Sequence, residues 1–198
     1  ELKVDGIGNV YVTGSSHGGT SKLDYVTIKY NTSGAQQWLK RYTNAAVNDT
    51  DAATGIDLDV YNNIYVTGYS KASSTNYDFA TIKYNNYDGT QMWLDRIDSG
   101  STDKAWDIKI IYRSCIGITQ HQGGELDIPC YDVFIYVTGE SFKTGSGKDF
   151  MTLGYNEGGS KRWITRYNGP QNGSDASSSI SVHPKYPIIY AGGVFASD

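Results

Sequence analysis

Two carboxylates alternate along one short apolar stretch of the 198-residue chain. Asp57 and Asp59 stand in "GIDLDV", and side chains two residues apart on a strand share a face. Paired carboxylates on one face can carry out glycoside hydrolysis. Equivalent positions in three related segments hold Lys3 and Asp5, Lys109 and Ile111, and Ser181 and His183. Acids are therefore not required there, which disfavours catalysis by this pair and leaves a ligand role open.

Two other stretches resemble ligand-binding motifs. The segment "NDTDAATGIDLD" at 48–59 is dense enough in oxygen ligands to be considered for calcium, which needs several oxygens converging in one loop. The segment "TGSGKD" at Thr144–Asp149 imitates a phosphate-binding loop, but that motif needs Gly and Ser or Thr where the chain has Phe142 and Asp149. We expect the second stretch to be a turn, and we expect no metal ion and no cofactor.

The two cysteines enclose one local segment. Cys115 and Cys130 flank "IGITQHQGGELDIP", which contains His121. A disulfide closing a loop of this size would stabilise the fold by roughly 3 kcal/mol and would indicate an oxidising, extracellular setting. The alternative is two free thiols in a cytosolic protein. Neither cysteine lies in a metal-binding CxxC pattern.

Composition bounds the class of protein. Hydrophobic residues make up 38% of the chain, and the formal net charge is -4. This mild acidity argues against a nucleic-acid binder, which would show a basic stripe. No apolar run is long enough to span a bilayer. The 17 Tyr and 23 Gly against 4 Pro indicate many short strands joined by tight turns.

One strand-like motif returns along the chain and reveals an internal repeat. It appears as "NVYVTG", "NIYVTG", "FIYVTG" and, most divergent, "IIYAGG". The motif tyrosines Tyr11, Tyr65, Tyr136 and Tyr190 are 54, 71 and 54 residues apart. The period is therefore 54, and the third unit carries an insertion of 17 residues. Three further landmarks keep the same phase: Asp24, Asp78 and Asp149; Trp38, Trp93 and Trp163; and Asp51, Asp103 and Asp175.

Each unit contains four alternating segments separated by turn residues, and no segment has helical periodicity. This pattern predicts an all-β fold of four-stranded antiparallel meanders, and repeats of about 40–50 residues built in this way form β-propeller blades. We predict blade 1 at 1–55, blade 2 at 56–107, blade 3 at 108–179 and the first half of blade 4 at 180–198. Closed propellers have about 4–8 blades, so we expect a segment of a larger propeller or edges covered by other copies.

The repeat resembles a known family. The run "GIDLDVYNNIYVTGYS", with the upstream Asp51 and the following "DFATIKYN" and "GTQMW", is similar to the SBBP-type β-propeller repeat of bacterial and archaeal surface proteins. The similarity covers the chain outside the cysteine loop. Weaker similarities point to NHL-type blades ("GNVYVT") and quinoprotein-type blades ("SGAQQWLKRY"). The resemblance implies the fold and specifies almost nothing about an activity.

The recurring residues are interpreted as structural. The regular phase of the tryptophans favours packing between neighbouring blades. Both aspartate series precede strands, where a carboxylate accepts backbone N–H bonds in a turn. The arginines three residues after each tryptophan are expected to pack on an aromatic ring or to pair with a carboxylate: Arg41, Arg96 and Arg166.

The insertion is the candidate interaction site. It falls between the first and second strands of blade 3, at 113–132, and forms a loop on one rim, where repeat proteins place variable binding loops. Trp106, which breaks the tryptophan phase, Tyr112, Arg113 and His121 are its candidate ligand residues. We expect a non-catalytic extracellular or cell-surface scaffold for adhesion or protein interaction. The alternatives are a glycan- or peptide-binding module using the loop, and a carbohydrate-active or quinone-dependent enzyme completed by missing blades.

Overall fold

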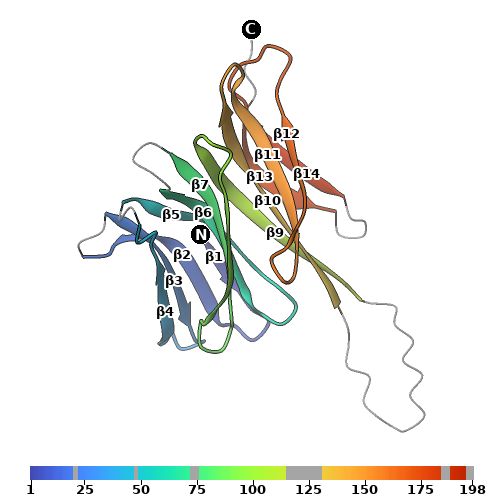
Figure 1. Cartoon of the computed structure of the whole chain (residues 1–198). Helices are drawn as coiled ribbons and strands as arrows, with labels where there is room; N and C mark the ends of the chain where they lie inside the picture. The colour runs from blue at the N-terminus through green and yellow to red at the C-terminus, as the bar shows by residue number, and fades with distance from the viewer. Residues whose placement is uncertain (20–21, 47–48, 72–75, 115–130, 184–187, 195–198) are drawn as a thin grey trace.

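The structure, a computed structural model, describes residues 1–19, 22–46, 49–71, 76–114, 131–183 and 188–194. All regular secondary structure in these residues is β-strand, and none of their segments is a helix of the length and apolarity that a membrane span requires. The strands form four antiparallel sheets in chain order (Figure 1). The prediction of an all-β chain of four-stranded antiparallel meanders is confirmed for three of these sheets.

Strand bounds follow the repeat. The first sheet contains β1 (Leu2–Val4), β2 (Val10–His17), β3 (Leu23–Tyr30) and β4 (Gln36–Tyr42). The second contains β5 (Asp51–Leu58), β6 (Ile64–Lys71), β7 (Tyr77–Tyr84) and β8 (Gln91–Ile97). The third contains β9 (Asp103–Ser114), β10 (Tyr131–Lys143), β11 (Gly147–Asn156) and β12 (Lys161–Tyr167). The fourth has two strands among the described residues, β13 (Ala176–Val182) and β14 (Ile189–Val194).

A β-bulge recurs in the first strand of three sheets. Thr54 is skipped in the register between β5 and β6, Trp106 between β9 and β10, and Ser178 between β13 and β14. A bulge reverses the inward and outward alternation. The predicted boundaries at 56, 108 and 180 therefore mark the point where regular alternation resumes, whereas the strands themselves begin at Asp51, Asp103 and Ala176.

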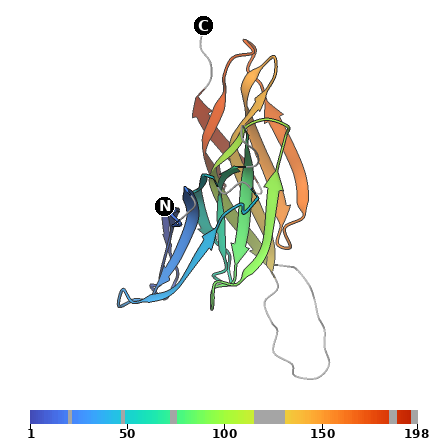
Figure 2. The same ribbon diagram turned by 60° about the vertical axis from the view of Figure 1, so that its left-hand side comes forward.

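Neighbouring sheets are stacked side by side in Figures 1 and 2. Buried apolar side chains fill the space between them. Tyr11, Tyr25 and Trp38 of the first sheet form one buried cluster with residues of the second, among them Ile56, Ile64, Val66 and Ile82. Tyr65 and Phe79 of the second sheet form another with residues of the third, among them Ile108, Ile135, Val137 and Met151. Each inner sheet thus gives one face to its predecessor and the other to its successor.

The two ends of the stack remain open. On the first sheet, Leu2 and Val4 are 57% and 56% exposed, although the equivalent Ile56 of the second sheet is fully buried. At the other end, β12 is exposed along its whole length, and Tyr190 on β14 is 57% exposed. The chain therefore carries apolar sheet surface that no described residue covers.

Candidate functional site

The paired acidic residues of the second sheet, Asp57 and Asp59, have different structural roles. Asp57 accepts a hydrogen bond from the backbone N–H of Ile110 at 2.8 Å and pairs with Lys3 at 3.2 Å, so it links three sheets. Glu1 and Asp107 make equivalent bonds to the next first strand, at Ile56 (3.0 Å) and Ile180 (2.9 Å). A carboxylate in or next to one first strand thus accepts a hydrogen bond from the next first strand at all three junctions. Glu1 lies just before β1, and Asp57 lies two positions later in the repeat than Glu1 and Asp107.

Asp59 stabilises the turn between β5 and β6. Its carboxylate accepts hydrogen bonds from the backbone N–H groups of Tyr61 and Asn63, from the Asn63 amide and from the Tyr65 hydroxyl, at 2.9–3.1 Å. Asp5 repeats this arrangement in the first sheet with Asn9 and Tyr11. With Asp57 directed to another sheet, the two carboxylates have separate partners, an arrangement unlike the pair of a glycosidase.

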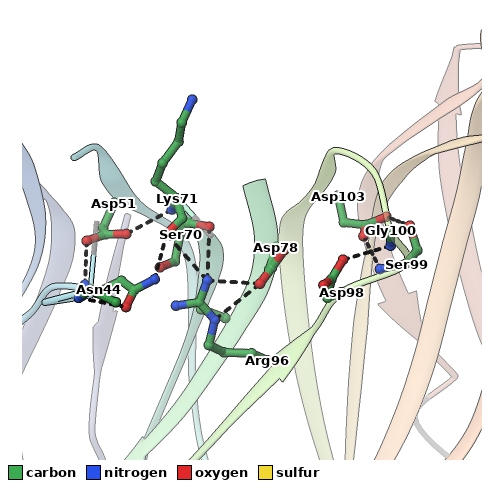
Figure 3. A network of polar contacts seen from close by, with 12 residues as sticks. Asn44, Asp51, Ser70, Lys71, Asp78, Arg96, Asp98, Ser99, Gly100 and Asp103 are labelled. Atoms are coloured by element: carbon green, nitrogen blue, oxygen red, sulfur yellow. Dashed lines mark hydrogen bonds and ion pairs between the residues drawn. The ribbon is translucent and has the colours of Figure 1, made fainter. Parts of the chain in front are cut away.

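The aspartates that open the first strands cap the loops between sheets (Figure 3). Asp51 accepts the N–H groups of Asn44 and Lys71, and Asp103 accepts that of Ser99, at 2.8–3.0 Å. Asp175 accepts the N–H of Gly169. The prediction of turn-capping carboxylates is confirmed for this series.

The second aspartate series has different partners. Asp78 pairs with Arg96 at 2.9 Å, and Arg96 also donates to the hydroxyl of Tyr42 in the first sheet (Figure 3 shows the Asp78 contact). Asp24 pairs with Arg41 at 3.6 Å, whereas Asp149 accepts from the Ser146 hydroxyl. Burial raises the pKa of Asp78, and the Arg96 contact offsets only part of this effect. The expected arginine–carboxylate pairing is therefore confirmed for Arg41 and Arg96.

The carboxylates of the oxygen-rich segment at 48–59, which was considered for calcium, do not point to one common position. Asp49 pairs with Lys22, while Asp51, Asp57 and Asp59 bind the separate groups described above. No three His, Cys, Asp or Glu side chains of the described ranges gather as a metal site would require. The phosphate-loop imitation is the turn between β10 and β11, with Gly145 and Gly147 at φ of 96° and 75°.

Tryptophans fasten one sheet to the turn of the next. The indole nitrogen of Trp38 donates to the carbonyl of Asn86 at 3.3 Å, and that of Trp93 donates to Glu157 at 2.9 Å. Trp38 is buried and Trp93 half-buried, which confirms the inter-sheet role for these two. Trp163 is 37% exposed, because no described segment of the fourth sheet supplies the corresponding turn.

A cavity of about 440 Å³ lies beside the contact between Trp93 and Glu157. It is lined by Lys83, Met92, Trp93, Glu157 and Gly158. The Lys83 ammonium is almost fully buried and contacts Glu157 at 3.1 Å and Asp59 at 3.5 Å. The lysine charge is therefore compensated, and the charged groups of the cavity hold two sheets together.

The predicted rim loop is described only at its base. Cys115, Cys130 and His121 lie outside the described residues. Arg113 pairs in register with Asp132, so part of the insertion extends β9 and β10. The rings of Tyr112 and Tyr131 are 5.6 Å apart, and Tyr61 of the second sheet stands 6.3 Å from Tyr131. The described base of the insertion thus carries a cluster of three tyrosines, and Arg113 lies 5.5 Å from the Phe134 ring.

Trp106 lies apart from the loop base. It occupies the bulge near the start of the 12-residue strand β9, whereas Tyr112 and Arg113 lie near its end. Its ring centroid is 5.7 Å from that of Tyr69 in the second sheet. Tyr69 in turn contacts Tyr77 at 5.3 Å. The structure therefore places Trp106 beside Tyr69 and Tyr77, which the sequence alone did not identify. These tyrosines could have been noticed because the equivalent positions of the other repeats hold different residues.

Comparison with known proteins does not assign a family. No protein-family model matches the chain, and no curated protein is significantly similar to it.

Proposed function

We propose that this chain is a non-catalytic β-propeller module that acts as a structural, adhesive or protein-interaction scaffold in a larger surface or filamentous protein. The observation that carries the proposal is the use of the chemically capable side chains. Glu1, Asp57 and Asp107 bind the backbone of the next sheet, and Lys83 and Arg96 are paired with carboxylates. These contacts give the chemically capable side chains a structural role, which favours a scaffold over an enzyme.

The propeller arrangement is supported by a repeated contact between successive sheets. Tyr25 reaches over Gly68 of the second sheet and donates to the carbonyl of Ala80 at 3.1 Å. Phe79 takes the same position over Gly139 of the third sheet. One geometry used at two junctions is what blades related by a common rotation require.

The contact of an aromatic ring with a glycine of the next sheet also indicates what could cover the first sheet. Gly14 is the equivalent glycine of the first sheet, and space above it is open. A hollow of about 180 Å³ lies there, lined in part by Val12, Val26 and Ile28. We propose that this face receives another sheet of the same repeat, from the same polypeptide or from a second copy. An apolar face of this kind is otherwise an association hazard.

The cell-surface location belongs to the same proposal. It rests on the resemblance to surface-protein repeats and on the cysteine pair at 115 and 130. A second candidate function, binding of a protein or glycan by the rim loop, is favoured by the tyrosine cluster at the loop base, because tyrosines supply large and rigid contact area.

Asp57→Asn and Asp59→Asn test the scaffold proposal directly. A scaffold predicts that each substitution lowers the free energy of unfolding by about 1–3 kcal/mol, measured by chemical denaturation. It also predicts that the unmodified chain does not hydrolyse a panel of aryl glycosides. Turnover by the unmodified chain that disappears in either variant, without loss of stability, would refute the proposal in favour of a glycosidase.

A further inference from the structure

Five side chains form a mixed aromatic and cationic cluster across the junction of the second and third sheets. Tyr69, Lys71 and Tyr77 belong to β6 and β7, and Lys104 and Trp106 belong to β9. All five are half-buried. The rings contact one another in edge-to-face geometry, with Tyr69 central between Tyr77 and Trp106.

Both ammonium groups are directed onto this aromatic surface. The Lys71 Nζ lies 4.3 Å from the centre of the Tyr77 ring. The Lys104 Nζ lies 4.8 Å from the same centre and 4.6 Å from that of Tyr69. Two cations near one ring repel each other, and cation–π attraction offsets only part of that repulsion.

Neighbouring carboxylates do not neutralise the two lysines. Asp51 and Asp103 accept backbone N–H groups, and Asp78 is paired with Arg96 (Figure 3). None of the ion pairs among the described residues involves Lys71 or Lys104. Glu140 stands opposite Lys104 in the register of β9 and β10, but it is paired with Lys148 at 2.9 Å. In Figure 3 the Lys71 side chain extends away from the network of Asp51 and Asp78.

The repeat does not require any of these five residues. Equivalent positions in the other sheets hold residues of different size and chemistry, and none of them repeats the aromatic residue or the lysine found in the cluster. Tyr69 corresponds to Ser15 and Glu140, and Tyr77 corresponds to Leu23 and Lys148. Lys71 corresponds to His17 and Phe142, Lys104 to Ala52 and Ala176, and Trp106 to Thr54 and Ser178. The cluster is therefore an addition to the fold at one junction, unlike the glycine, tryptophan and aspartate contacts that recur.

We propose that this cluster, Tyr69, Lys71, Tyr77, Lys104 and Trp106, binds an acidic carbohydrate. The aromatic rings supply apolar faces for a sugar ring, and the two ammonium groups supply charge-assisted hydrogen bonds for its carboxylate or sulfate ester. A bound anion also relieves the repulsion between the lysines. The contacts help to join two sheets, but the other junctions form without these residues. Binding of a ligand by this cluster therefore goes beyond the scaffold role.

Titration calorimetry with a trigalacturonate and with a sulfated disaccharide measures the binding and separates the two sources of negative charge. We expect at least one of them to bind the unmodified chain. Lys71→Gln combined with Lys104→Gln should weaken binding about tenfold or more, and Trp106→Thr, which installs the residue of the second sheet, should weaken it about tenfold. Lys143→Gln is the matched control, because Lys143 is an exposed lysine of β10 outside the cluster, and it should leave the affinity unchanged.

Circular dichroism of each variant checks that the sheets are intact. Inorganic sulfate and a neutral trigalactoside serve as half-ligands, and each should bind more weakly than the acidic sugars. The inference is overturned if neither acidic sugar binds, if sulfate alone binds equally well, or if the lysine variants bind as the unmodified chain does. It is also overturned if the Lys143 control loses affinity to the same extent, because that result would indicate general charge attraction.

Discussion

At the scale of single residues, we expect the Asp5 carboxyl to make stability depend on pH. Burial of its carboxyl favours the neutral acid, but hydrogen bonds from Asn9, Ile7 and Tyr11 outweigh this and lower its pKa below the ordinary value of 3.8. A carboxylate with a depressed pKa in the folded state stabilises the protein above the unfolded-state pKa. Its contribution is lost as the pH falls through the folded-state value.

We therefore expect Asp5→Asn to lower stability near neutral pH and to flatten the loss of stability below about pH 4. Urea denaturation across this pH range, with unmodified and variant chains side by side, measures the slope. An unchanged slope in the variant would show that the Asp5 carboxylate does not supply the acid sensitivity.

The tryptophans provide a second test at this scale. Trp93→Phe removes the hydrogen bond to Glu157 and part of the ring contact with Tyr65 and Tyr155, so it should lower the free energy of unfolding by about 1–3 kcal/mol. Trp163→Phe is the matched control from the third sheet, where the ring is 37% exposed, and it should cost less than about 1 kcal/mol. Equal losses in thermal denaturation would contradict the fastening role of Trp93.

At the scale of strands, Gly68 lies where the bulged first strand of its own sheet and a ring of the preceding sheet both come close. A methyl group on Gly68 would overlap the carbonyl oxygen of Ala52 and lie 2.8 Å from the Tyr25 hydroxyl, whereas one on Gly14 meets open space. Gly68→Ala should therefore cost about 1–3 kcal/mol or more, and Gly14→Ala should stay within about 0.5 kcal/mol. Chemical denaturation of the two variants compares the positions, and a costly Gly14→Ala would show that the first sheet is packed differently from this description.

Strand order followed from the sequence because the "YVTG" strand and its turns repeat with little change. The first residue of each first strand could not be predicted in the same way. Bulges interrupt the alternation of apolar and polar residues on which the prediction relied, at Thr54, Trp106 and Ser178. The Asp57 and Asp59 pair was recognised, but its partners were not. Ile110 is more than 50 residues away from Asp57, and no local pattern encodes that contact.

At the scale of the whole molecule, the sequence located a candidate insertion but not the cluster around Trp106. Trp106 was noticed because it breaks the tryptophan phase, yet Tyr69, Lys71 and Tyr77 come from strands of another sheet. Their proximity depends on how two sheets stack, which propensity and alternation do not determine. Comparing each position across the repeats is the approach that would have found them, because structural contacts recur and this cluster does not.

Because the first sheet has an exposed apolar face, we predict that the chain associates with itself. Leu2, Val4 and the hollow beside Gly14 continue the stacking surface that the second and third sheets bury. Sedimentation velocity at increasing protein concentration should therefore reveal dimers or larger species. Val4→Lys places a charge on this face and should shift the population toward monomer. Tyr87→Lys removes an 88% exposed aromatic in the turn between β7 and β8 and should leave association unchanged. A chain that stays monomeric at every concentration, or equal effects of the two variants, would show that this face does not bind a second copy.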